Sequence, residues 1–263
     1  MSSAEPRSFE EYLGWLARER DSHSCESPDY VARKAAAKAR MLETFGETSS
    51  QQAQHALLGQ LRMPYFRMGA IDSVNLFDID ELIIFAFYCS TRGLYPKAID
   101  IGANIGLHSI VMAKLGMVVR CYEPDPIHLQ RLQANVALNG VQDNVEAVMA
   151  AVSDYSGHAE FVRVLGNTTG SHLAGAKTGS YGGLERFDVR VEPIALAIEG
   201  VDFMKLDAEG EEARILLSTT AAQWERMDAI VEVGSPRNAE LIHGHFDRIG
   251  INLFAQKRNW ERV

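Results

Sequence analysis

Apolar residues recur at helical spacing through the first third of the chain. Phe9, Leu13 and Leu16 would share one face of a helix, and residues 29–45 are rich in the helix formers Ala, Lys and Arg. We therefore expect residues 1–93 to form a helical N-terminal extension or cap. The predicted helices cover residues 9–20, 29–45 and 49–61, and a more hydrophobic one runs from Asp78 or Asp80 to residue 88.

From residue 97 the pattern changes to short apolar runs that alternate with helical segments. This alternation is typical of βαβ units around a parallel sheet, so the second part, residues 94–263, is expected to be an α/β domain. The predicted strands are 98–101, 117–122, 145–151, 201–206 and 229–233, with two short closing strands at 251–255 and 260–263. The predicted helices are 105–115, 126–138, 211–217 and 238–249, the second of them capped by Asp125.

One region between the third and fourth predicted strands departs from this alternation. Residues 159–164 and 186–191 have extended character, and they enclose a segment, 166–183, that contains six glycines. Such a composition favours an exposed loop. Two interpretations stay open, a lid or substrate loop and a disordered connector.

Composition and charge narrow the class of partner. The net charge is −9, which disfavours binding of a nucleic-acid backbone, so we expect a small-molecule acceptor instead. No apolar run approaches the roughly 20 residues of a membrane span, and residues 1–20 do not resemble a secretory signal. The three cysteines, Cys25, Cys89 and Cys121, are too scattered for a disulfide framework or a zinc site, which makes a cytoplasmic location the default expectation.

The clearest chemical motif is Asp100-Ile-Gly-Ala-Asn-Ile-Gly106, which follows a predicted strand and opens a helix. Glycines at such a turn let a ligand approach the backbone, and the helix N-terminus offers unpaired N–H groups. The turn alone is a weak signal that many nucleotide-binding proteins share. Glu123, at the end of the next strand, could accept both ribose hydroxyl protons of an adenosine ligand. Together they indicate an adenosine-containing cofactor.

Asp100 bears on which cofactor this is. A carboxylate in the turn would repel a pyrophosphate but could receive the ammonium group of an amino-acid moiety. S-adenosylmethionine carries that ammonium and no phosphate, so the sequence favours it over a nicotinamide dinucleotide. The alternative for Asp100 is a purely structural role in the turn.

Five blocks of the sequence, in order, resemble FkbM-type class I methyltransferases. They are 99–106, Tyr122-Glu-Pro124, Asn135-Val-Ala-Leu-Asn139, Ala151-Val-Ser-Asp154 with Gly157, and Phe203-Met-Lys-Leu-Asp-Ala-Glu-Gly-Glu211. The resemblance implies a Rossmann-like class I methyltransferase sheet of seven mostly parallel strands, the last of them reversed. It also implies S-adenosylmethionine-dependent O-methylation of a hydroxyl on a sugar, polyketide or other small metabolite.

The resemblance also implies the cofactor-binding residues. Glu123 would hold the ribose, Pro124 would shape the turn beside it, and the adenine would lie near Ala151 and Asp154. The methionine end and the cofactor's backbone contacts would fall to Asp100, Gly102, Ala103, Asn104 and Gly106. Two departures leave the acceptor pocket undetermined: the connection 192–200 is short, and His108 replaces a common aromatic residue.

Methyl transfer to an alcohol needs alignment of the acceptor oxygen and removal of its proton. Asp207 is the first candidate for this, followed by Glu209 and Glu232, all at predicted strand ends. His172, in the glycine-rich segment, is an alternative base. The same three acids could bind Mg²⁺, because hard cations prefer carboxylate oxygens. The sequence does not favour a metal site, since it shows no pair of acids at the close spacing of metal ligands.

Two other functions stay open at this level. A nicotinamide-dependent oxidoreductase could use a similar strand–turn–helix, although a second glycine in place of Ala103 or Asn104 would then be expected. A non-catalytic protein could retain only the cofactor-binding fold, although Asp100 and Glu123 are both present. The N-terminal helices could cap the acceptor site, mediate homodimer formation, or do both.

Overall fold

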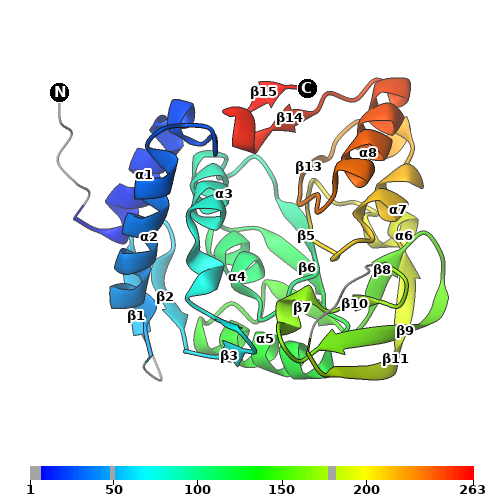
Figure 1. Ribbon diagram of the computed structural model, residues 1–263, viewed down its shortest axis with the longest axis horizontal. Coiled ribbons are helices and arrows are strands. Elements are labelled where there is room, and N and C mark those ends of the chain that lie inside the picture. The colour runs from blue at the N-terminus through cyan, green and yellow to red at the C-terminus, as the bar shows by residue number, and fades with distance from the viewer. Residues whose placement is uncertain (1–6, 48–50, 177–181) are drawn as a thin grey trace.

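A computed structural model describes residues 7–47, 51–176 and 182–263. Its N-terminal part contains three of the predicted helices, α1 (Phe9–Arg18), α2 (Tyr30–Phe45) and α3 (Ile79–Ser90), which lie together on one side of the molecule (Figure 1). A capping box starts α1, because the Ser8 side chain accepts from the Glu11 backbone and the Glu11 side chain accepts in return. Two short 3₁₀ helices, η1 (Arg20–Ser22) and η2 (Asn75–Phe77), complete this helical layer.

The helix predicted over residues 49–61 is wrong for every position that the structure describes. This stretch forms a β-hairpin of β1 (Gln51–His55) and β2 (Gly59–Met63), paired antiparallel. Its buried side chains alternate, with Ala53 and His55 buried in one strand and Leu61 and Met63 in the other. A two-residue period is the spacing of a strand, and here it prevails over the helix propensity of the segment. A second small hairpin follows, β3 (Arg67–Met68) and β4 (Ile71–Asp72).

The central sheet has the order β13-β12-β5-β6-β7, and all of its pairings are parallel. Its strands are β5 (Lys97–Ile101), β6 (Val118–Tyr122), β7 (Val145–Val148), β12 (Phe203–Leu206) and β13 (Asp228–Val231). The helices on its faces are α4 (Leu107–Lys114), α5 (Pro126–Leu138), α6 (Ile194–Ala197), α7 (Glu212–Leu217) and α8 (Pro236–Ile249). The parallel α/β fold is therefore confirmed, with the short connection 192–200 containing the single turn α6.

The expectation of seven strands with a reversed last strand is wrong, because the central sheet has five strands among the described residues and all of them are parallel. The two closing segments pair with each other instead, as β14 (Phe254–Ala255) and β15 (Glu261–Arg262) around the 3₁₀ helix η5 (Gln256–Arg258). Their hairpin docks on the N-terminal helices. Trp260 stacks on Phe87 with ring centroids 5.5 Å apart, and its indole N–H donates to His23 Nδ1 over 2.9 Å.

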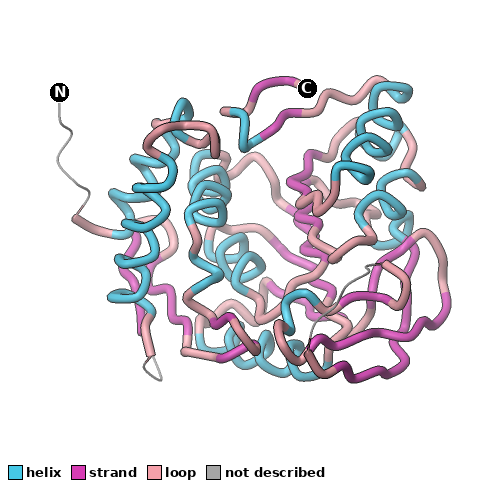
Figure 2. The backbone as a smooth tube through the Cα atoms, viewed as in Figure 1, coloured by secondary structure: helices cyan, strands magenta, loops and turns pink. Residues whose placement is uncertain are grey.

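A second sheet, of order β10-β9-β11-β8, lies at the end of the molecule away from α1 and α2 (Figure 2). It confirms the extended character of 159–164 and 186–191, which belong to β9 (Gly157–Val164) and β11 (Leu184–Pro193). The strand predicted over 145–151 divides, because after β7 the chain turns into β8 (Ala151–Ser153), which pairs parallel with β11. The start of the glycine-rich segment forms η3 (Thr168–Gly170) and β10 (His172–Leu173) on β9, while residues 177–181 lie outside the described residues.

Burial divides the interior into two large apolar clusters. One joins α1, α2 and α3 to α4 and β6, so the N-terminal helices share a core with one face of the central sheet. The other lies between the opposite face and helices α6, α7 and α8, where the 3₁₀ helix η4 (Ala221–Trp224) also packs. The division at 93/94 stays a prediction. Among the described helices, none has the length and apolar character to cross a bilayer.

Candidate active site

A cavity of about 230 Å³ lies at the carboxyl ends of β5, β6, β12 and β13, where open α/β sheets bind their ligands. The lining residues that come mainly from β6, α5 and the second sheet are Tyr122, Glu123, Pro124, His128, Ala150, Ala151, Val152, Phe161, Thr168, Thr169, Ser171 and Leu173. The remaining lining residues are Leu76, Glu81, Ile101, Gly102, Asn104, Asp207, Ala208, Glu209, Glu211 and Glu232. Six of these side chains are carboxylates, and within the described ranges 7–47, 51–176 and 182–263 no lysine or arginine lines the cavity, so this part of the lining is acidic.

The glycine-rich turn fits closely against its neighbours. Gly102 has a φ of +78°, and a Cβ placed on it would lie 1.8 Å from the Asp207 carbonyl oxygen. Only glycine fits there, because both the backbone angle and the space exclude a side chain. Gly106 (φ +87°) caps α4, and a Cβ would come within 2.8 Å of Leu132 Cγ. The first contact places the turn directly against the end of β12, and the second places it against α5.

Glu123 is joined to this turn from the next strand. Its Oε2 accepts from the Asn104 backbone N–H at 2.8 Å, and its Oε1 accepts from the Asp125 N–H at 2.8 Å. Burial raises the pKa of Glu123 to about 8, helped by the charges of Asp125 and Asp100, although the two backbone hydrogen bonds act in the opposite direction. The carboxyl group is fixed in place and faces the cavity.

Asp100 is fully buried and does not line the cavity. Ser109 Oγ donates to its Oδ2 over 2.6 Å, and Lys205 Nζ lies 3.8 Å from its Oδ1. Lys205 also lies 3.4 Å from Asp207 Oδ2 and 3.5 Å from the Gly102 carbonyl oxygen. Burial lowers the pKa of Lys205, but the surrounding carboxylates, Asp207 first and Asp100 next, raise it further than burial lowers it. The buried ammonium therefore joins the turn to the end of β12.

All three predicted catalytic acids line the cavity. Asp207 and Glu209 follow β12, and Glu232 follows β13. The negative charge of Asp207, with partial burial second, raises the pKa of Glu232 to about 6. Glu209 holds a left-handed backbone conformation, with φ at +52°. Strained backbone conformations of non-glycine residues cluster at ligand-binding and active sites.

The other predicted site residues divide between the cavity lining and positions outside it. Pro124 and Ala151 line the cavity, whereas Ala103, Gly106 and Asp100 do not. Asp154 is also outside the lining and pairs with Arg214 over 2.7 Å. His172 is buried outside the cavity, with its Nδ1 3.0 Å from the Gly170 carbonyl oxygen.

Sequence reasoning missed several cavity residues. Glu81, from the N-terminal helix α3, contributes a carboxylate whose Oε2 lies 2.9 Å from His108 Nε2, and the other ring nitrogen of His108 lies 3.1 Å from the Tyr88 hydroxyl. No local motif marks Glu81, because its place in the site depends on how α3 packs. His128, Phe161 and the described part of the glycine-rich segment form another wall, and the extended segments flanking those glycines were the available signal.

The described residues do not form a metal-binding site. Over residues 7–47, 51–176 and 182–263, no group of three or more His, Cys, Asp or Glu side chains could hold one. Asp207, Glu209 and Glu232 share the cavity without reaching ligand spacing, so they do not fit a Mg²⁺ site in this arrangement.

Comparison with known proteins decides the family. Residues 100–255 match the model of the methyltransferase FkbM domain. The chain belongs to the FkbM methyltransferase domain family. It is therefore a methyltransferase, and the oxidoreductase alternative falls away. A curated relative, Methyltransferase sdnD of Sordaria araneosa, is 24% identical over an alignment 236 residues long, which covers 76% of this chain and 90% of that protein.

Two solved structures are also similar. Methyltransferase FkbM from Methylobacillus flagellatus has 14% identity, with 89% of this chain and 58% of that chain covered and a TM-score of 0.43. A SAM-dependent methyltransferase from Agrobacterium tumefaciens has 9% identity, with 76% of this chain and 58% of that chain covered and a TM-score of 0.44. This chain thus spans a little over half the length of each of these two solved chains.

Proposed function

We propose that this methyltransferase takes its methyl group from S-adenosylmethionine and transfers it to a hydroxyl group of a small metabolite. The observation that carries the proposal is that one cavity joins Glu123 and the glycine-rich turn to the acids Asp207 and Glu232. A ribose-binding carboxylate on one side and proton acceptors on the other suit transfer from an adenosyl cofactor to an alcohol.

The residues present fit the cofactor. Glu123 would accept from the ribose hydroxyls, while Pro124 and Ala151 would flank the adenosine. Asn104 Oδ1 is buried, and the described residues offer it no hydrogen-bond partner, so it suits a donor group of the ligand. Gly102 and Asn104 would border the methionine end, supported from behind by Ala103, Gly106 and the Asp100–Lys205 contact.

S-adenosylmethionine, when bound, would supply a methyl group attached to a positively charged sulfur, and the sulfur is the leaving group when an acceptor oxygen takes the methyl group. The chain's own residues must orient the acceptor hydroxyl and take its proton. Glu232 suits the proton acceptor, because its pKa of about 6 lies near neutral pH. Asp207 faces the Lys205 ammonium, so it suits orientation of the hydroxyl as a hydrogen-bond acceptor. No metal ion enters this scheme.

The other parts of the proposal concern the cellular location, the homodimer and the capping role of the N-terminal helices. All three cysteines are free, which supports a reducing, cytoplasmic location. The exposed apolar side chains Val31 and Leu42 on α2 support contact between N-terminal helices of two copies, the homodimer expected from the sequence. Glu81 brings α3 to the cavity, which supports a capping role for the same region at the acceptor side.

Calorimetric titration with S-adenosylhomocysteine tests the cofactor. The wild-type chain should bind it at micromolar concentration, and at pH 9, where Glu123 is largely charged, Glu123→Gln should weaken binding about tenfold. Glu146→Gln is the matched control, because Glu146 pairs with Arg120 at an exposed position on the neighbouring strand. Failure of the wild-type chain to bind at millimolar ligand would overturn the proposal.

The acceptor class is tested separately. Methyl-labelled S-adenosylmethionine would be incubated with a panel of sugars, glycosides and polyketide alcohols, and matched amines and thiols would serve as controls. Label should appear as a methyl ether, and Glu232→Gln should slow its formation at least a hundredfold. Transfer only to nitrogen or sulfur would contradict O-methylation while leaving the cofactor assignment intact.

A further inference from the structure

The second sheet supplies one wall of the cavity. Phe161 from β9, Thr168 and Thr169 from η3, and Ser171 and Leu173 around β10 all line it. We refer to residues 161–173 as the cover. Glu123, Pro124 and Ala151 line the same cavity, and Ala151 lies in β8 of the same sheet, so the cover shares the cavity with the proposed ribose and adenine contacts.

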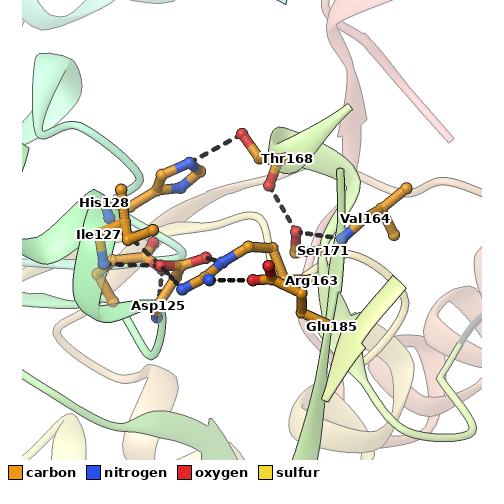
Figure 3. A network of polar contacts seen from close by, with 9 residues as sticks. Asp125, Ile127, His128, Arg163, Val164, Thr168, Ser171 and Glu185 are labelled. Atoms are coloured by element: carbon orange, nitrogen blue, oxygen red, sulfur yellow. Dashed lines mark hydrogen bonds and ion pairs between the residues drawn. The ribbon is translucent and has the colours of Figure 1, made fainter. Parts of the chain in front are cut away.

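Arg163 ties the cover to the start of α5. Its guanidinium makes two hydrogen bonds to the Asp125 carboxylate, Nε to Oδ2 over 2.6 Å and Nη2 to Oδ1 over 2.7 Å (Figure 3). Asp125 is 1% exposed, Arg163 8%, and Arg163 also reaches Glu185 on β11 over 2.5 Å. Such a two-point pair fixes orientation as well as distance. Asp125 also caps α5 by accepting from the Ile127 N–H at 2.8 Å, so one carboxylate serves both elements.

His128 makes a second tie one turn further along α5. Its Nε2 lies 2.9 Å from Thr168 Oγ1 at the cavity wall. The Thr168 carbonyl oxygen accepts from Ser171 Oγ at 2.7 Å, and Ser171 Oγ accepts from the Val164 N–H at 3.1 Å. Figure 3 shows these contacts as one connected network between α5 and the cover. The polar groups of the cover are thus held by α5 and by each other.

The same start of α5 is connected to the proposed ribose site. Glu123 accepts from the Asp125 N–H, and Asp125 is the residue that Arg163 holds. A displaced cover would leave Asp125 buried beside Glu123 without its counter-charge. Glu123 and Asp125 are held in place before a ligand binds. The entropy cost of ordering them is therefore not subtracted from the binding free energy.

We propose that Arg163 and His128 are positioning residues for the cofactor, which hold the cover as the outer wall of its adenosyl end. This inference rests on the proposed use of S-adenosylmethionine. Both residues act from outside the glycine-rich turn and Glu123, through the way the second sheet packs on α5.

The test compares two probes, S-adenosylhomocysteine and 5′-methylthioadenosine, which share the adenosyl part and differ in the amino-acid part. Arg163→Met should weaken binding of both probes by the same factor, at least tenfold, with unchanged stoichiometry. Arg163→Lys should lose less, because it keeps the charge but not the two-point geometry. Arg186→Met is the matched control, since Arg186 pairs with Glu160 between the same strands β9 and β11 at an exposed position, and both affinities should stay unchanged.

Thr168→Val provides a second test that does not touch a buried charge. It removes the hydroxyl that faces His128 and should weaken both probes threefold or more, whereas His128→Gln, which retains a hydrogen-bonding group, should lose less. Folded Arg163→Met and Thr168→Val proteins that bind both probes within twofold of wild type would overturn the inference. So would a loss confined to S-adenosylhomocysteine, and if Arg163→Met does not fold, Thr168→Val decides. A wild-type chain that binds neither probe would instead overturn the proposed function.

Discussion

The backbone N–H of Asn104 donates a 2.8 Å hydrogen bond to Glu123 Oε2, which joins the glycine-rich turn after β5 to the end of β6. Asn104 can donate in this direction because it holds a left-handed backbone conformation, with φ at +53°. The same contact occupies one lone pair of the carboxylate and leaves others for a ligand. The two sequence features that indicated an adenosyl cofactor are therefore one connected structure.

The first prediction concerns the protonation of Glu123. Its pKa is raised to about 8 from an ordinary value near 4.5, so the group is largely protonated at pH 6.5 and largely charged at pH 9. A charged carboxylate accepts hydroxyl protons better than a carboxylic acid, so affinity for 5′-methylthioadenosine should rise about tenfold across this range. This probe has no amino-acid group that titrates there. Calorimetry at half-unit steps checks the profile, and Glu123→Gln should flatten it; a flat wild-type profile would contradict the assignment.

A second prediction uses the close contact of the turn with β12. Gly102→Ala meets both an unfavourable φ and the Asp207 carbonyl oxygen, whereas Gly116→Ala meets only an unfavourable φ of +98° with open space around it. We expect Gly116→Ala to lower the free energy of unfolding by about 1 kcal/mol and Gly102→Ala by about 3 kcal/mol or more. Urea denaturation of both variants measures the difference. Equal losses would mean that the turn relaxes away from Asp207.

The sequence predicted those parts of the fold whose signals are local. The alternation of strands and helices from residue 97, the Asp125 cap of α5 and the extended segments around the glycines are all confirmed. Each of them depends on residues within a few positions, where turn and capping chemistry act directly. The family resemblance was confirmed as well.

The incorrect or missing predictions concern segments whose structure depends on contacts with distant parts of the chain. Residues 251–263 contain strand-forming runs, but whether they extend the sheet beside β13 or fold back on themselves depends on Trp260 finding Phe87 and His23. The segment 51–63 became a hairpin because its alternating residues find buried partners among the N-terminal helices. Glu81 enters the site through the packing of α3, which no spacing along the sequence reports.

A third prediction follows from the acids around Asp207. The pKa of Glu232 is raised to about 6 from near 4.5, so the native state binds this proton more tightly than the unfolded chain. The resulting cost to stability is absent below pH 4.5, grows as pH rises to 6 and is complete above it. Glu232→Gln should therefore raise the melting temperature at pH 8, by an amount equivalent to about 1 kcal/mol or less given its solvent exposure, and leave it unchanged at about pH 3.5, where both states are protonated. Thermal denaturation at both pH values measures this, and an equal gain at the lower pH would contradict the charge explanation.

The last prediction concerns Lys205, whose ammonium lies between the carboxylates of Asp100 and Asp207. Lys205→Met leaves the fully buried Asp100 without a counter-charge, so we expect a loss of about 3–5 kcal/mol in the free energy of unfolding. Lys34→Met is the control, because the Lys34–Asp78 pair is partly exposed to solvent and should be worth about 1 kcal/mol or less.

A double variant separates the charge effect from lost packing at Lys205. Asp100→Asn in the Lys205→Met background removes the orphaned charge, so the two changes together should cost less than the sum of each alone. Urea denaturation of the wild type, the single variants and the double variant completes the cycle. Strictly additive losses would show that Lys205 contributes through its aliphatic stem, and that the Asp100–Lys205 contact does not fix the turn against β12.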